Sequence, residues 1–160
     1  MACEAMDDLA ARYADRGVTS VFVYTHEAHP GEHYGPHRSM DDKRHHARAF
    51  VEHSRVRRPI WLDDLEGTCH RAWGELPNMT WILGRGGLIL YKAMWTDAGD
   101  VEHALADALE HWDRRKPEKL RPFYSERLGW RPDDTEGFRA GLRRAGPQAL
   151  RDFYGDDGPK

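Results

Sequence analysis

The sequence predicts an α/β fold in which helices cover both faces of a mixed sheet. Helical and strand patterns alternate between residues 4 and 115 in the order α-β-α-β-α-β-β-α, and a glycine-rich turn joins the last two strands. Alternating strands pair in parallel across helical connections, whereas a short turn joins antiparallel strands. With 160 residues, 39% of them hydrophobic, the chain can form one domain with a sizeable core.

The first two elements are a helix over residues 4–16 and a strand over residues 19–25. The helix is predicted because its apolar residues recur at helical spacing and Gly17 follows it. The strand "TSVFVYT" is a continuous β-branched and aromatic run, which is typical of a strand buried on both faces. The apolar residues of the helix are Met6, Leu9, Ala10 and Tyr13.

Residues 39–56 predict a second helix, with Ser39 as N-cap and Asp41 and Asp42 in its first turn. A strand over 58–64 and a short helix over 65–75 follow. Two apolar runs around "GRGG" then predict a hairpin over residues 79–95, since its glycines tolerate positive φ. The last helix of this part covers residues 97–115, and its apolar stripe is Val101, Leu105, Ala108, Leu109 and Trp112.

The pattern changes after Lys116, where five prolines and several aromatic residues occur. We therefore divide the chain into a main domain, 1–116, and a helical C-terminal extension, 117–160. The extension is expected to pack its apolar side chains on the main domain. These side chains are Phe123, Tyr124, Leu128, Trp130, Phe138 and Phe153.

Composition limits the function classes. A net charge of -3 and a pI near 6.4 give no electrostatic reason to expect binding to nucleic acid or to an anionic membrane. The apolar runs are far too short to span a bilayer. The first ten residues are acidic and resemble no signal peptide, so we expect a cytoplasmic protein. In that compartment Cys3 and Cys69 are expected to be free thiols.

Histidine is enriched in one region, because seven of the ten histidines lie between His26 and His53. Glu27 and His29 follow the buried strand, and residues two apart on a strand share a face. A carboxylate beside an imidazole at the carboxyl end of a strand suits proton transfer, although the pair could equally be a buried ion pair that anchors the loop. We expect no metal site, since the loop of His33 and His37 contains two prolines and lacks a helical metal motif.

Three segments resemble the iodothyronine deiodinase-like branch of the thioredoxin-fold redox proteins. They are "VYTHEAHPGEHYGPHRSMDDKRHHARAF", "DDLEGTCHRAWGELPNMTWIL" and "GLILYKAMW". The resemblance covers residues 1 to 112 and implies a thioredoxin-like sandwich, an external thiol reductant, and no cofactor or metal. The residues that match the signature Y-x-x-E-A-H-P of that branch are Tyr24, Glu27, Ala28, His29 and Pro30.

One feature of that branch has no counterpart in the sequence. Its cysteine or selenocysteine nucleophile precedes the first helix and would align two residues before Met1, and the central strand would lie earlier still. We expect either a longer natural chain or a protein without this nucleophile. Without that strand, two strand edges would be covered by direct pairing, by homodimerisation or by the extension. Cys3 is the candidate resolving or substitute thiol, because a helix N-terminus lowers a thiol pKa.

Other candidate residues also come from the resemblance. Glu27 and His29 would handle protons around the nucleophile and the substrate. His46 would match a histidine of that branch on the second helix and would be a further catalytic residue, for which His45 is the alternative. Pro77 falls where thioredoxin-like proteins place a cis-proline. Tyr24, Leu76, Pro77 and Asn78 would line the substrate site.

Two functions are therefore open. The first is a thiol-dependent oxidoreductase that reduces a peroxide, a disulfide or a carbon-halogen bond. The second is a thioredoxin-like binding or partner module without catalytic activity. A reactive thiol of low pKa would distinguish the first from the second.

Overall fold

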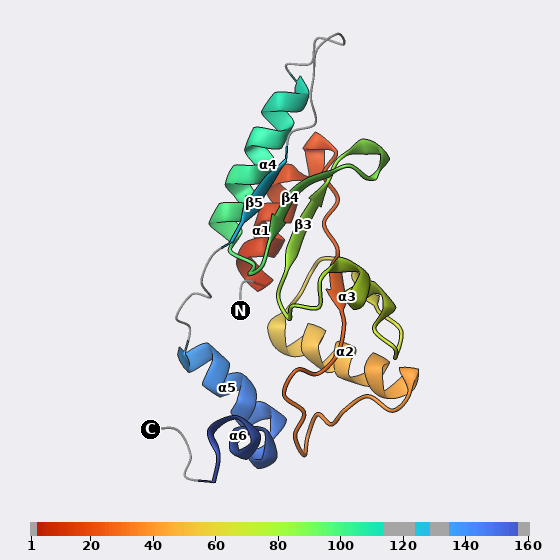
Figure 1. Ribbon diagram of the computed structural model, residues 1–160, viewed down its shortest axis with the longest axis vertical. Coiled ribbons are helices and arrows are strands. Elements are labelled where there is room, and N and C mark those ends of the chain that lie inside the picture. Colours follow the sequence, from red (N-terminus) through yellow and green to blue (C-terminus); the bar gives the residue numbers. More distant parts are fainter. Residues whose placement is uncertain (1–2, 114–123, 129–134, 157–160) are drawn as a thin grey trace.

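The computed structural model describes residues 3–113, 124–128 and 135–156 (Figure 1). It confirms the α/β class. The elements, in chain order, are α1 (Cys3–Tyr13), the 3-10 helix η1 (Ala14–Arg16), β1 (Phe22–Tyr24), α2 (Met40–Ser54), β2 (Ile60–Leu62), α3 (Thr68–Trp73), β3 (Thr80–Leu83), the 3-10 helix η2 (Arg85–Gly87), β4 (Ile89–Ala93), α4 (Ala98–Asp113), β5 (Ser125–Arg127), α5 (Thr135–Ala145) and α6 (Pro147–Tyr154).

The strands form two sheets, so the prediction of one mixed sheet is wrong for the described residues. β1 and β2 pair in parallel, as the alternating pattern predicts. β3 and β4 form the predicted antiparallel hairpin, and β5 pairs with β4 in parallel. Within the described part of the chain, no strand hydrogen-bonds to both β1 and β3, which is why the two sheets stay separate.

β1 is shorter and less buried than the sequence predicts. Only Tyr24 of its three residues is buried, while Phe22 and Val23 are half-buried. The expectation of a strand buried on both faces is therefore wrong. The physical reason is that β1 has β2 as its one paired neighbour in the described sheets, and a two-stranded sheet has little surface to cover.

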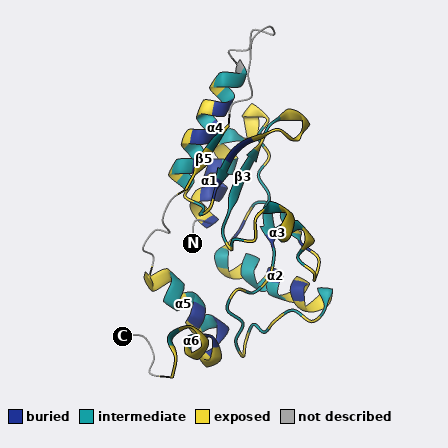
Figure 2. Ribbon diagram, in the orientation of Figure 1, coloured by how far each residue is buried: buried dark blue, intermediate teal, exposed yellow. Residues whose placement is uncertain are grey.

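The main core lies where α1 and α4 meet β4, and Figure 2 shows the buried residues gathered there. Tyr91 and Ala93 are two residues apart on β4 and therefore point to the same face of the sheet. Both pack against the two helices. The helical residues of this core are Met6 and Leu9 of α1 and Val101 and Ala104 of α4.

α4 has the predicted amphipathic pattern. Val101, Leu105 and Ala108 of the predicted stripe are buried, and Leu109 and Trp112 are half-buried. No helix in residues 3–113, 124–128 and 135–156 is long and apolar enough to cross a bilayer.

A buried ion pair connects α1 to the segment before β2. The Arg58 guanidinium donates through Nε to Asp7 Oδ1 at 2.5 Å, and the Arg57 amide donates to Asp7 Oδ2 at 2.8 Å. The side chains of Asp7 and Arg58 are 1% and 9% exposed. Both charges are largely removed from water, so each needs a partner of opposite charge for its stabilisation.

Replacing Asp7 should therefore be costly. We expect Asp7→Asn to lower the free energy of unfolding by about 3–5 kcal/mol, because it leaves the buried guanidinium without a countercharge. Urea unfolding followed by circular dichroism measures this change. Asp8→Asn is the matched control, since the Asp8 pair with Arg57 is at the surface and should contribute little. Equal losses in both variants would contradict the expectation.

The C-terminal extension differs from its predicted form. The polar segment Ser125–Arg127 adds strand β5 to the main sheet, which hydrophobic periodicity could not predict. Tyr124 and Leu128 are 51% and 71% exposed, so their predicted packing on the main domain is wrong. Phe138 and Phe153 do pack, with each other and with His29. The predicted contacts of Phe123 and Trp130 lie outside the described residues.

Candidate functional site

The candidate site begins at the carboxyl end of β1, where Tyr24 is 8% exposed. Its phenol hydroxyl donates a hydrogen bond to Oε1 of Glu27, three residues further along the chain. Burial, followed by this hydrogen bond, raises the pKa of Tyr24, so the hydroxyl remains a donor at neutral pH. Tyr24 therefore orients the Glu27 carboxylate.

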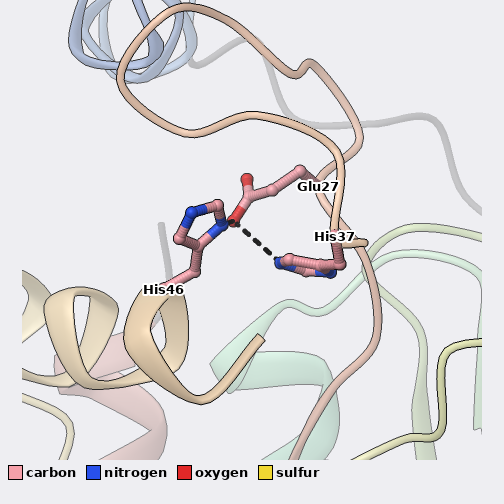
Figure 3. A group of neighbouring side chains, drawn as sticks. All are labelled: Glu27, His37 and His46. Atoms are coloured by element: carbon pink, nitrogen blue, oxygen red, sulfur yellow. Dashed lines mark ion pairs between the residues drawn. The ribbon is translucent and has the colours of Figure 1, made fainter. Parts of the chain in front are cut away.

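Two histidines point at the same carboxylate oxygen (Figure 3). Nδ1 of His46, on α2, lies 3.7 Å from Glu27 Oε1, and Nε2 of His37, on the loop before α2, lies 4.0 Å from it. The two imidazole rings have their centroids 5.0 Å apart. We call Tyr24, Glu27, His37 and His46 the Glu27 cluster.

The start of α2 fixes the spacing between the two histidines. Ser39 is the N-cap, as predicted, and its hydroxyl accepts the Asp42 amide at 3.0 Å. The Asp42 carboxylate in turn accepts the Arg38 amide at 3.1 Å. This reciprocal cap holds the residue after His37 on the helix end, and His46 follows within the second turn.

The two histidines of the Glu27 cluster are largely buried, and the cluster is not fully hydrogen-bonded. The side chains of His37 and His46 are 5% and 11% exposed, while that of Glu27 is 23% exposed. His37 Nε2 and His46 Nδ1 are buried and have no hydrogen-bond partner among the described residues. Burial lowers the pKa of His37, which favours the neutral imidazole. Two nitrogen atoms beside a carboxylate can take up a proton or coordinate a cation.

The structure places His29 away from the neighbours predicted for it. The strand ends at Tyr24, so the rule that residues two apart share a face does not extend to Glu27 and His29. The His29 ring instead packs edge-on against Phe138 of α5 and Phe153 of α6, with centroids 5.3 Å away in both cases. Glu27 has His37 and His46 as its imidazole neighbours.

The loop that carries Glu27 and His37 is docked on α5 and α6. The Glu32 carboxylate accepts the amide of Gln148, in the first turn of α6, at 2.8 Å, and this hydrogen bond lowers the pKa of Glu32. The His33 amide donates to Ala145 O, at the end of α5, at 2.9 Å. The backbone is so close there that a Cβ at Gly31 would lie 2.3 Å from the same oxygen.

Gly31→Ala should loosen this docking, because the added methyl group must push the loop off the end of α5. We expect unfolding to become about 1–3 kcal/mol more favourable and amide exchange in residues 25–39 to speed up. Gly35→Ala is the control in the same loop, since its Cβ would meet no atom closer than 3.9 Å. A Gly31→Ala variant with the exchange profile of the parent protein would contradict the inference.

Neither cysteine is activated. Cys3 is 8% exposed on α1, and burial raises its pKa even though the Arg58 charge acts in the opposite direction. Burial also raises the pKa of Cys69 on α3. Both thiols are free. The expectation of a lowered Cys3 pKa is therefore wrong, because desolvation of the thiolate outweighs the helix N-terminus.

Slow alkylation is the consequence. With a raised pKa and a buried sulfur, Cys3 should react with iodoacetamide at pH 7 at least several-fold more slowly than a free thiol of pKa about 8.5. The alkylation rate of Cys3 should rise as the pH increases above about 8.5, because more of the thiol is then ionised. Mass spectrometry of timed samples measures it, and the protein in urea is the control. Rapid labelling of folded Cys3 at pH 6 would contradict the expectation.

The segment between α3 and β3 contains Leu76, Pro77 and Asn78, and the backbone carbonyl oxygens of Leu76 and Asn78 make contacts that hold it. Leu76 O is 3.1 Å from His70 Nε2, and Asn78 O accepts the Thr96 amide at 2.8 Å. The expected cis bond at Pro77 is wrong, because no peptide bond in the described residues is cis. The His26 and His70 rings, with centroids 5.0 Å apart, link the loop after β1 to α3.

Sequence reasoning selected Tyr24, Glu27 and His46, which the structure does bring together. It considered His37 only as a possible metal ligand and expected no metal site. The local enrichment of histidine was the signal in the sequence that could have pointed to His37. His45, the alternative to His46, is exposed.

Comparison with protein-family models, curated proteins and solved structures finds no match to this chain.

Proposed function

We propose that the protein is a thiol-dependent oxidoreductase of the deiodinase-like, thioredoxin-fold class, and that the Glu27 cluster is its proton-handling site. The observation that carries the proposal is the convergence of a phenol, a carboxylate and two imidazoles at one point. This point lies at the carboxyl end of β1, which pairs in parallel with β2. In open α/β sheets ligands bind at the carboxyl ends of parallel strands.

The reacting thiol is external in this proposal, because burial raises the pKa of both Cys3 and Cys69. An imidazole of the Glu27 cluster takes the proton of a bound thiol, and the Glu27 carboxylate stabilises the resulting imidazolium. The thiolate attacks one sulfur of a disulfide, so one S–S bond forms and one breaks. The leaving thiolate then recovers the proton. Peroxides and carbon-halogen bonds are the other acceptors of this class.

A binding or partner module is the second candidate function. The raised pKa of both thiols favours it, since a thioredoxin-like module without an activated cysteine could still bind a partner. The two candidates differ in one measurable respect. Only the enzyme accelerates exchange between a small thiol and a disulfide above the rate in buffer.

The test is reduction of a small disulfide by glutathione, with a chelator present so that metal ions play no part. We expect Glu27→Gln to lower the catalysed rate about 10²-fold or more, the usual effect of losing an acid–base group. Glu52→Gln is the matched control, because Glu52 is an exposed carboxylate on α2. Absence of any rate above buffer in the parent protein, both in chelator and after a divalent metal ion is added back, would reject the enzyme and leave the partner module.

A further inference from the structure

Three side chains of the Glu27 cluster have the composition of a metal site. Glu27, His37 and His46 each offer one ligand atom, and these atoms all lie within 4.8 Å of one another. They come from two segments, the loop after β1 and helix α2, so sequence proximity alone does not bring them together (Figure 3). Two imidazoles and one carboxylate form the ligand set of several catalytic zinc and non-haem iron sites.

The free nitrogen atoms are the independent observation that points to a ligand. His37 Nε2 and His46 Nδ1 are buried and lack hydrogen-bond partners, although both are close to Glu27 Oε1. A buried polar atom without a partner costs about 1–3 kcal/mol, so two of them in one cluster need an explanation. A cation between the three side chains would satisfy both nitrogen atoms at once.

We propose that Glu27, His37 and His46 bind one divalent transition-metal ion of the Zn²⁺ class. Tetrahedral Zn²⁺ places its ligand atoms about 3.4 Å apart. The distances from Glu27 Oε1 to the histidine nitrogens are 3.7 and 4.0 Å, and all three ligand atoms lie within 4.8 Å of one another, so the side chains would move closer together on binding the ion. The Tyr24 hydroxyl donates to the same oxygen, Glu27 Oε1, and would hold the carboxylate in place, as hydrogen-bonded neighbours of metal ligands commonly do.

Two positive charges act on the cluster, that of Lys43 on His37 and that of Arg144 on Tyr24, so the Glu27 carboxylate is the group that would attract a cation there. Lys43, which lies on the same helix as His46, is 1% exposed and donates through Nζ to Asp64 O at 2.8 Å. Its ammonium also interacts with the carboxylates of Asp63 and Asp64, so its charge is partly balanced. The Arg144 guanidinium lies over the Tyr34 ring, with Cζ 6.0 Å from the ring centroid.

The inference deepens the proposed function by naming an ion for the same site, but it is tested separately. The three side chains leave a fourth tetrahedral position open for water or a thiol donor. A thiol bound there would lose its proton to solvent and become a metal-bound thiolate. The ion would then replace the imidazoles as the group that activates the thiol, because a histidine nitrogen that binds the ion cannot also accept the thiol proton.

The experiment is a calorimetric titration of chelator-treated protein with Zn²⁺, without any thiol. We expect one tight site in the parent protein and at least 10-fold weaker binding in His46→Gln. His45→Gln is the matched control, because His45 is the exposed neighbour on the same helix and should leave the affinity unchanged. His37→Gln is the second variant and should also weaken binding, which covers a folding failure of the first.

A parent protein without a one-to-one site would overturn the inference. So would equal weakening by His45→Gln and His46→Gln, which would indicate adventitious binding to surface histidines. Zinc binding with the expected variant pattern but no thiol–disulfide exchange would reject the proposed function and keep the metal site. Exchange activity in chelator, in a protein without any Zn²⁺ site, would keep the proposed function and reject the metal site.

Discussion

The candidate site depends on one steric constraint, the close approach of the β1–α2 loop to the end of α5. A Cβ at Gly31 would overlap the Ala145 carbonyl, so the loop reaches this position only because residue 31 is glycine. The Glu32 carboxylate and the His33 amide then attach the loop to the two C-terminal helices. Glu27 and His37 lie on this loop, so its docking on α5 and α6 positions two members of the Glu27 cluster.

Burial explains the different properties of the chemical groups. It raises the pKa values of Cys3 and Cys69 and lowers that of His37, because a dry environment disfavours the charged form in each case. Burial therefore favours the protonated thiols and the neutral imidazole, which keeps a lone pair for a proton or a metal ion. The same physical effect weakens the case for a cysteine nucleophile in this chain and strengthens the case for chemistry at the Glu27 cluster.

Because the strands form two separate sheets, the helices pack around each sheet separately. The hairpin, β5, α1 and α4 form one body around the core at Tyr91 and Ala93. β1 pairs with β2 and contacts α2 through Phe22 and Phe50. The buried Asp7–Arg58 pair connects α1 to the segment that enters β2. A polar contact thus carries part of the coupling that a continuous sheet would otherwise provide.

The sequence alone determined the α/β class, the hairpin, the Ser39 cap and the apolar stripe of α4, because each follows from local periodicity or turn chemistry. It also selected Glu27 and His46. Only the tertiary structure decided that His37 joins them while His29 packs on Phe138, since contacts between a loop and distant helices leave no periodic signal. Strand β5 was equally hidden: its pairing uses backbone hydrogen bonds, which any residues except proline can make.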